Sequence, residues 1–122
     1  MTMMREIRGE LAYHAGLSAE MQIAKYYTAQ GYELLEQRWR GGAGEIDLIL
    51  ANSRCVVFVE VKKARDLATA ASRITMRQLQ RIYVSAEEYI LAMRNPPLEA
   101  RIDAALVDGT GAFDVIENAY RA

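Results

Sequence analysis

The chain has 122 residues, enough for one domain with its own hydrophobic core, and we expect a single domain over residues 1–122. Its 15 basic and 16 acidic residues nearly cancel, which excludes a generally polycationic protein and leaves only a local surface for binding polyanions. The single cysteine, Cys55, excludes an intrachain disulfide and a multi-cysteine zinc site. Without a long apolar run or a signal-peptide pattern, we expect a cytoplasmic protein with no membrane partner.

The first helix is predicted to follow an N-terminal extension, residues 1–15, that we expect to be poorly ordered. Ser18 is a suitable N-cap, and the helix should run to about Gln30, just before Gly31. Glu20 falls on the apolar side of this helix, an unusual position for a carboxylate. Either the helix dipole favours it in the first turn, or it reaches an acidic cluster elsewhere in the fold.

A strand is predicted over residues 32–39, followed by a glycine-rich turn over residues 41–44 that permits left-handed backbone angles. Arg38 and Arg40 flank Trp39 in the sequence and are candidate contacts to nucleic-acid phosphates or bases. Trp39 is explained equally well as a cap on the hydrophobic core.

The strongest strand patterns cover residues 44–50 and 55–62, and the second is a dense β-branched run. The turn-forming residues between them predict an antiparallel hairpin whose loop is centred between Ser53 and Arg54. These two strands are expected to lie at the centre of the sheet.

This register places Asp47 directly opposite Glu60 on one face of the sheet, with Lys62 and Glu45 on the same face. Strict alternation predicts Ile46 on the other face. Two carboxylates and a lysine therefore converge among apolar residues, where charge is costly.

Like charges this close stay ionised more readily when a cation lies between them, and carboxylate oxygens suit Mg²⁺ or Mn²⁺. Asp47 and Glu60 are the candidate metal ligands, and Lys62 could orient water or neutralise charge on a phosphate. The alternative is an ordinary cross-strand charge cluster in which Lys62 pairs with Glu45 or Glu60.

After Lys62 the sequence becomes basic, with Asp66 as the only opposing acid up to residue 81. Residues 66–72 are predicted to form a loop, and residues 75–93 a long amphipathic helix. A basic ridge with no acid four residues away is expected to bind a polyanion, although such a ridge is usually a solvated surface. The ridge consists of Arg73, Arg77 and Arg81, which recur every four residues. The preceding Lys63 and Arg65 are further candidate contacts to nucleic acid.

The remainder of the chain predicts two strands, over residues 101–107 and 113–116, after a break at Pro96-Pro97. With the preceding elements this predicts an α/β domain, in which a mixed sheet built around the central hairpin is flanked by helices on both sides.

Several segments together resemble the PD-(D/E)XK, or restriction-endonuclease-like, nuclease superfamily, and more closely its YraN-type bacterial family. They are the Gly44–Ile49 stretch G-E-I-D-L-I, the Phe58–Lys62 stretch F-V-E-V-K, the upstream Ser18-Ala19-Glu20 and Gly31–Leu35, and Arg38 and Arg40. The resemblance implies a restriction-endonuclease-like fold and a metal-dependent nuclease site.

The resemblance also assigns roles to individual residues. It favours Glu20 as a further catalytic and metal-binding residue beside Asp47 and Glu60. Asp103 matches the aspartate of a late R-x-D element and is expected to support the site indirectly. Gln78 stands where such proteins tend to carry lysine, so its expected role is binding of phosphate or water.

The expected function is Mg²⁺- or Mn²⁺-dependent hydrolysis of nucleic-acid phosphodiesters, in DNA in preference to RNA and in structured or branched DNA in particular. Branched substrates would suit a homodimer. The first alternative is a non-catalytic module that binds nucleic acid or a protein on a nuclease-like fold. The second is a small-molecule phosphoesterase, which the length of the basic ridge argues against.

Overall fold

The structure, a computed structural model, describes residues 18–120, so the expectation for residues 1–15 lies outside the described residues. The described chain contains a helix over residues 18–28, followed by β1 (Glu33–Gly41), β2 (Gly44–Ala51), β3 (Cys55–Lys63), α2 (Leu67–Ser72), α3 (Met76–Ala92), β4 (Glu99–Val107) and β5 (Phe113–Ile116). Between residues 18 and 120, no helix is both long and apolar enough to cross a membrane.

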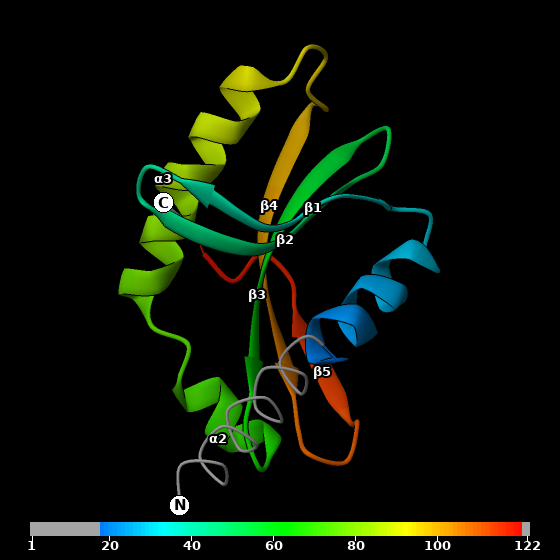
Figure 1. Ribbon diagram of the computed structural model, residues 1–122, viewed down its shortest axis with the longest axis vertical. Coiled ribbons are helices and arrows are strands. Elements are labelled where there is room, and N and C mark those ends of the chain that lie inside the picture. The colour runs from blue at the N-terminus through cyan, green and yellow to red at the C-terminus, as the bar shows by residue number, and fades with distance from the viewer. Residues whose placement is uncertain (1–17, 121–122) are drawn as a thin grey trace, which may run out of the picture.

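The five strands form one mixed sheet in the order β1-β2-β3-β4-β5. The first three strands pair antiparallel, β3 and β4 pair in parallel, and β5 pairs antiparallel with β4. The parallel pair requires a long connection, and α2 and α3 supply it. Helix 18–28 and α3 lie on opposite sides of the strands (Figure 1). The predicted α/β architecture with a central hairpin and flanking helices is confirmed.

The β2–β3 hairpin has the predicted register. Leu48 pairs with Val59, which places the centre of the loop where the sequence predicts it. The turn is closed by Asn52, whose side-chain oxygen accepts hydrogen bonds from the backbone N–H groups of Arg54 at 2.9 Å and Cys55 at 2.8 Å. An asparagine that satisfies the backbone in this way stabilises a tight turn without a glycine.

The β1–β2 pair extends beyond its contact with β3 as a ribbon that crosses in front of β3 and β4 (Figure 1). The pairing of β2 with β3 ends at Leu48, whereas β1 and β2 stay paired to their connecting turn. In this ribbon Ile46 packs with Ile49 beneath α3. The prediction that Ile46 lies on the opposite face was therefore wrong, because a two-stranded ribbon twists more strongly than the interior of a sheet.

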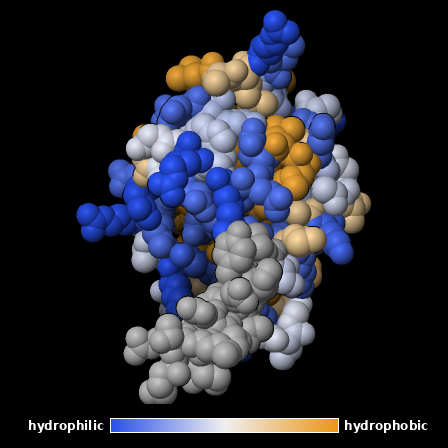
Figure 2. Space-filling model, viewed as in Figure 1, coloured by the Kyte–Doolittle hydropathy of each residue, from blue (hydrophilic) through white to orange (hydrophobic). Residues whose placement is uncertain are grey.

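Two apolar clusters fill the space on the two faces of the sheet. One packs helix 18–28 against the sheet through buried residues that include Ile23, Tyr27, Leu48, Leu50, Val57 and Val59. The other packs α3 against the opposite face through Ile49, Val56, Phe58, Leu79, Ile82 and Ala86. Outside these clusters, hydrophilic residues cover much of the visible surface, including the side on which α3 lies (Figure 2). Because successive side chains of β3 point to opposite faces, its apolar residues contribute to both clusters.

The prediction of a loop over residues 66–72 was wrong, because most of this segment forms the short helix α2. Asp66 is its N-cap, and the Asp66 side chain accepts a hydrogen bond from the backbone N–H of Thr69 at 2.7 Å. Three alanines in the six residues of α2 favour the helix, and Ala70 packs it against the core. The basic composition around the segment obscured this capping signal.

The long helix α3 is confirmed close to its predicted start, with Thr75 as its N-cap and Met76 as its first residue, and it ends at Ala92. The predicted end at Met93 is one residue too far, because Met93 has an extended backbone and is the C-cap. The helix therefore ends four residues before Pro96. A proline disfavours helical angles in the residue before it, which is Asn95 here.

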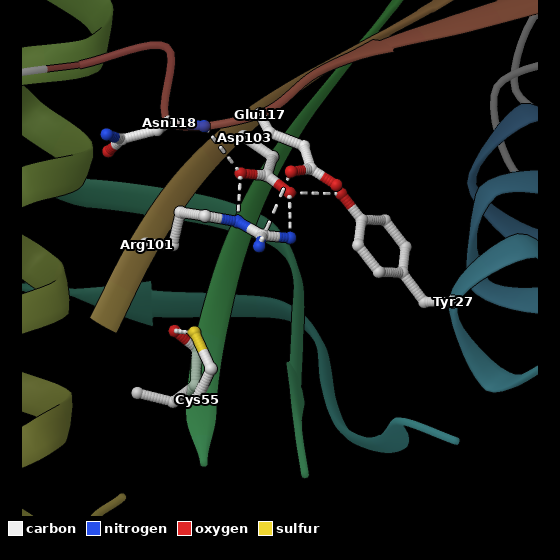
Figure 3. Close-up of polar contacts among 7 residues, drawn as sticks. Tyr27, Cys55, Arg101, Asp103, Glu117 and Asn118 are labelled. Carbon is white, nitrogen blue, oxygen red and sulfur yellow. Dashed lines mark hydrogen bonds and ion pairs between the residues drawn. The ribbon is translucent and has the colours of Figure 1, made fainter. Parts of the chain in front are cut away.

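A polar network around Asp103 joins the sheet to helix 18–28 and to the end of the chain (Figure 3). Asp103 is fully buried, and its carboxylate accepts hydrogen bonds from Tyr27 Oη at 2.6 Å and from the backbone N–H of Asn118 at 2.9 Å. Arg101 donates two more, from Nε at 2.8 Å and from Nη2 at 2.9 Å. Burial and this carboxylate raise the pKa of Tyr27 far above its ordinary value. A buried charge is stable here because its hydrogen-bonding capacity is satisfied.

Candidate active site

A hollow of about 270 Å³ lies between the sheet and the N-terminal half of α3. We call it the β2–α3 hollow. Side chains from both hairpin strands and from the helix line it: Glu45, Asp47, Glu60, Lys62, Gln78, Arg81 and Ile82, with Gly44 at its edge. The structure therefore brings together the predicted acidic pair, the predicted lysine and one arginine of the basic ridge.

Asp47 is the most strongly perturbed group in this hollow. The β2–β3 register, continued by one residue, places it opposite Glu60, and its Oδ2 accepts a hydrogen bond from the backbone N–H of Val61 at 2.8 Å. The pKa of Asp47 is raised from 3.8 to about 7, and burial is the largest cause. The negative charges of Glu60, Glu20 and Glu45 contribute to this increase, and the hydrogen bond from the Val61 N–H opposes it. The charged form of Asp47 is therefore disfavoured without a cation nearby.

Lys62 is held at the mouth of the hollow by two acceptors. Its Nζ lies 3.2 Å from Glu60 Oε1, and the Lys62 side chain is only 24% exposed. When the Gln78 amide is oriented so that both of its polar atoms have partners, its oxygen accepts from Lys62 Nζ at 3.3 Å and its nitrogen donates to Arg73 O at 3.0 Å. Gln78 thus contacts the lysine of the site directly, and this fixes the position of the ammonium group.

Glu20 is buried on the core side of helix 18–28, as its place on the apolar side predicted. Its Oε2 accepts a hydrogen bond from Arg38 Nε at 3.1 Å. Arg38 adopts a left-handed backbone angle, φ 49°, and lies opposite Asp47 in the register of β1 and β2. The Glu20–Arg38 pair therefore adjoins the hollow, and the negative charge of Glu20 is felt at Asp47. Its role as a metal ligand stays a prediction.

The glycine-rich turn packs against α3. The backbone N–H of Gly42 donates to Glu88 Oε2 at 2.8 Å, and Ser85 Oγ donates to the carbonyl of Gly44 at 3.3 Å. A side chain at Gly41 would clash with Trp39 and Ser85, at 2.7 and 2.9 Å. The sequence interpretation missed Ser85 and Glu88. Ser85 lies on the core-facing side of α3, next to buried Ala86, and a polar residue in that position was the available signal.

Of the two explanations for Trp39, the structure supports the cap on the core. Its ring packs against the α3-side cluster and makes an edge-to-face contact with Tyr89, with ring centroids 5.1 Å apart. Arg40 points outward and lies 3.7 Å from Glu45, with 79% of the Arg40 side chain exposed.

The predicted basic residues lie in different parts of the fold. Arg77 and Arg81 are exposed on α3, and within residues 18–120 neither has an ion-pair partner. Arg73 lies before the helix and donates to the carbonyl of Lys63 at 3.4 Å, so it does not continue the α3 ridge as predicted. Arg65 pairs with the neighbouring Asp66 at 3.3 Å, and Lys63 is exposed at the end of β3.

The structure does not bring Asp103 to the β2–α3 hollow. Asp103 pairs in register with Val59, whose side chain packs on the face covered by helix 18–28, and Tyr27 binds it from that side. Glu60, the next residue on β3, belongs to the opposite face. Asp103 therefore holds the scaffold together rather than contacting the predicted site.

The donor set of the hollow fits a hard divalent cation. Asp47 and Glu60 supply carboxylate oxygens, and the pKa of Asp47 is raised by burial and by the negative charge of Glu60, which a cation would offset. Among residues 18–120, no three His, Cys, Asp or Glu side chains group closely enough to hold a metal by themselves. Mg²⁺ is commonly held by one or two carboxylates, with water and substrate phosphate completing its coordination.

The fold and the hollow together define a class: an α/β protein with a five-stranded mixed sheet between helices, consistent with a restriction-endonuclease-like fold, and with an acidic pair and a lysine beside its central hairpin. Comparison with known families is more specific. The model of the family described as "Uncharacterised protein family UPF0102" matches residues 19–117. The chain belongs to this family, which is the YraN-type family that the sequence resembles.

Relatives in the same family cover most of the chain. A UPF0102 protein of Roseobacter denitrificans is 48% identical over 112 residues, which span 91% of this chain and 87% of that protein. A UPF0102 protein of Cereibacter sphaeroides is 45% identical over 115 residues, spanning 93% and 98%. One from Dinoroseobacter shibae is 38% identical over 117 residues, spanning 93% and 86%. These relatives are therefore similar to this chain along nearly their whole length.

The perturbed carboxyl of Asp47 predicts a characteristic dependence of stability on pH. Because its pKa is about 7 in the folded chain against an ordinary 3.8, the folded chain binds this proton more tightly than the unfolded chain does. The contribution of Asp47 to stability is therefore present in acid and is lost as the pH rises from about 4 to about 7. The slope is at most about 1.4 kcal/mol per pH unit for one proton.

Asp47→Asn should remove this slope, so in EDTA the variant should gain stability relative to wild type as the pH rises to 8. Urea denaturation of both proteins at several pH values measures the difference, in which the other titrating groups largely cancel. Parallel stability curves between pH 4 and pH 7 would show that Asp47 is not perturbed.

Proposed function

We propose that this protein is a metal-dependent nuclease that hydrolyses phosphodiester bonds in nucleic acid, with DNA preferred over RNA. The observation that carries the proposal is the β2–α3 hollow. There Asp47 and Glu60 adjoin one another, the pKa of Asp47 is raised to about 7, and Lys62 is held beside them. A protein without chemistry at this position would gain stability by losing the buried charge of Asp47, which is repelled by Glu60.

The two carboxylates and the lysine of the hollow have different parts in the proposed mechanism. Asp47 and Glu60 would hold a Mg²⁺ or Mn²⁺ ion, which when bound polarises a phosphate and lowers the pKa of a water molecule. Lys62, fixed by Glu60 and Gln78, presents its ammonium group where negative charge develops on the phosphate. This fixed position matters because a preorganised charge stabilises a transition state better than a mobile one.

The basic residues of α3 would hold the substrate next to the hollow. Arg81 lines the hollow itself, and Arg77 lies one helical turn before it. Arg77 lies in the first turn of α3, where the helix dipole favours negative charge rather than arginine. An exposed arginine that works against the dipole, followed one turn later by a second arginine with no ion-pair partner within residues 18–120, is best explained by a polyanion. The same placement argues for an extended substrate rather than a small phosphate ester.

Cleavage is the first test. Glu60→Gln and Lys62→Ala should each lower metal-dependent cleavage by at least about a hundredfold, the usual effect of removing a group that acts on the reacting phosphate. The measurement is a panel of single-stranded, duplex, flapped and four-way DNA and of RNA, with Mg²⁺ or Mn²⁺.

Glu33→Gln and Lys25→Ala are matched controls, because both residues are exposed and lie outside the hollow. Full activity in both site variants would reject the assignment. Binding without cleavage by wild type would instead indicate the non-catalytic module. Light scattering of the protein alone and with four-way DNA tests for the homodimer.

Metal binding is tested without a substrate. Mn²⁺ should raise the melting temperature of wild type, because an ion that binds only the folded chain stabilises it by about 2.7 kcal/mol at a hundred times its dissociation constant. Asp47→Asn should lose most of this response while melting no lower than wild type in EDTA. A variant that melts lower in EDTA and still responds fully to Mn²⁺ would mean that Asp47 belongs to an ordinary charge cluster.

The arginines of α3 are tested by salt dependence. Replacing Arg77 and Arg81 together by glutamate should weaken binding to all nucleic-acid sequences and reduce the slope of log affinity against log salt by about two, roughly one for each lost phosphate contact. Fluorescence anisotropy in EDTA measures this. Arg94→Glu, an exposed arginine beyond the end of α3, is the control. If the slope of the double variant equals that of wild type, the ridge is only a solvated surface.

A further inference from the structure

A second hollow, of about 100 Å³, lies on the other flank of α3 from the β2–α3 hollow. We call it the α3–β4 hollow. Phe58 and Ile102 of the sheet contribute to its lining, Ala86 and Ile90 come from α3, and Tyr83 and Tyr120 bring two aromatic rings. None of these residues has a part in the chemistry proposed above.

The two tyrosines lie at the open side of this hollow. Their ring centroids are 5.4 Å apart and the rings are tilted by 43°, so they neither stack in parallel nor meet edge to face. Tyr83 is 37% exposed, although most large apolar side chains of α3 that face the sheet are buried. An accessible aromatic face of this kind can stack on another planar ring.

Polar groups border the same hollow. Asn118 and Glu87 contribute to its lining. The backbone N–H of Asn118 is bound to Asp103, but its side-chain amide has no hydrogen-bond partner within residues 18–120. That amide points toward α3 (Figure 3). The Arg101 guanidinium also lines the hollow, but it is bound to Asp103 and paired with Glu117. The hollow thus presents a neutral donor and acceptor from Asn118 and a carboxylate from Glu87.

The two hollows belong to the same face of the sheet. Phe58 lies in the α3–β4 hollow, and Glu60, two residues further along β3 on the same face, lies in the β2–α3 hollow. Two strand residues span about 7 Å. The helix separates the hollows, with Arg81 on one flank and Tyr83 on the other. A strand bound along Arg77 and Arg81 therefore has to cross only the width of α3 to reach the tyrosines.

We propose that the α3–β4 hollow binds one base of a single-stranded nucleic acid whose phosphates lie on Arg77 and Arg81. The base stacks on Tyr83, and the Asn118 amide contacts its hydrogen-bonding edge. This inference rests on the proposed function, because it takes the strand held beside the β2–α3 hollow as its starting point. It makes an unpaired segment, such as a frayed end or a flap, part of the substrate.

The charges of the hollow select a base rather than a phosphate. Glu87 would repel a phosphate group, whereas its carboxylate can accept a hydrogen bond from the amino group of a base. The apolar floor formed by Phe58 and Ile102 suits a planar ring. Arg101, the cationic residue of the lining, is already paired with two carboxylates, so it attracts a phosphate only weakly. Stacking on an aromatic ring is tolerant of sequence, so the hollow adds affinity for every base.

Binding of short oligonucleotides in EDTA tests this proposal without cleavage. Tyr83→Ala should weaken binding of single-stranded DNA by roughly five- to 150-fold, the range of base–aromatic stacking. Tyr83→Phe should retain most of the affinity, because it keeps the ring. The salt slope of Tyr83→Ala should equal that of wild type, since no phosphate contact is lost. Leu91→Ala is the control, because Leu91 is an exposed apolar residue of α3 outside the hollow.

An abasic oligonucleotide of the same length separates this inference from the proposed function. It carries the same phosphates, so wild type and Tyr83→Ala should bind it equally, and charge reversal at Arg77 and Arg81 should still weaken it. If Tyr83→Ala weakens binding of both oligonucleotides equally, or of neither, the base-binding hollow alone is overturned. If wild type binds neither oligonucleotide, both the hollow and the proposed function are wrong.

Discussion

The register of the β2–β3 hairpin is the constraint from which the rest of the site follows. It is set by a turn that Asn52 closes with its own side chain, and it fixes which residue of β2 faces which residue of β3. A shift by one residue would move every side chain to the other face, exchanging buried apolar residues for charged ones. Because both faces of β3 are covered, such a shift is strongly disfavoured, and Asp47 is held opposite Glu60 despite the repulsion between them.

The surrounding elements resist that repulsion in different ways. The Val61 N–H stabilises the charged form of Asp47, and the ammonium group of Lys62 neutralises Glu60. On the far side of β2, Arg38 takes a left-handed backbone angle and reaches Glu20. Acidic and basic side chains therefore neighbour one another through the site. The raised pKa of Asp47 nevertheless shows that its negative charge is only partly compensated. Incomplete compensation is expected where a protein must leave room for a further positive charge.

Much of this arrangement could be predicted from the sequence, because it depends on short-range patterns. Alternation along β3 and the turn residues were enough for the hairpin register, and with it the opposition of Asp47 and Glu60. The helical period of α3 identified its buried face. The family resemblance added Glu20, which packing alone would have left as a buried acid of unexplained role.

The failures have a common physical origin in tertiary structure. Ile46 changes face because the β1–β2 ribbon twists after it leaves β3, and no local pattern encodes where that departure occurs. Asp103 was expected near the site, but the parallel register of β4 with β3 decides its face, and that register depends on the α2–α3 crossover. Ser85 and Glu88 matter only because the glycine turn packs against them.

The parallel pairing of β3 with β4 also sets the order in which the site can assemble during folding. The β2–β3 hairpin closes over a few residues, whereas β4 and α3 join it only after a crossover of more than thirty residues has been closed. The two carboxylates can therefore meet before Gln78 and Arg81 arrive. For that interval the nascent site has Lys62 but lacks the groups that α3 contributes in the folded chain. If the proposed cation binds the two carboxylates at that stage, it would lower the barrier to folding as well as stabilise the final structure.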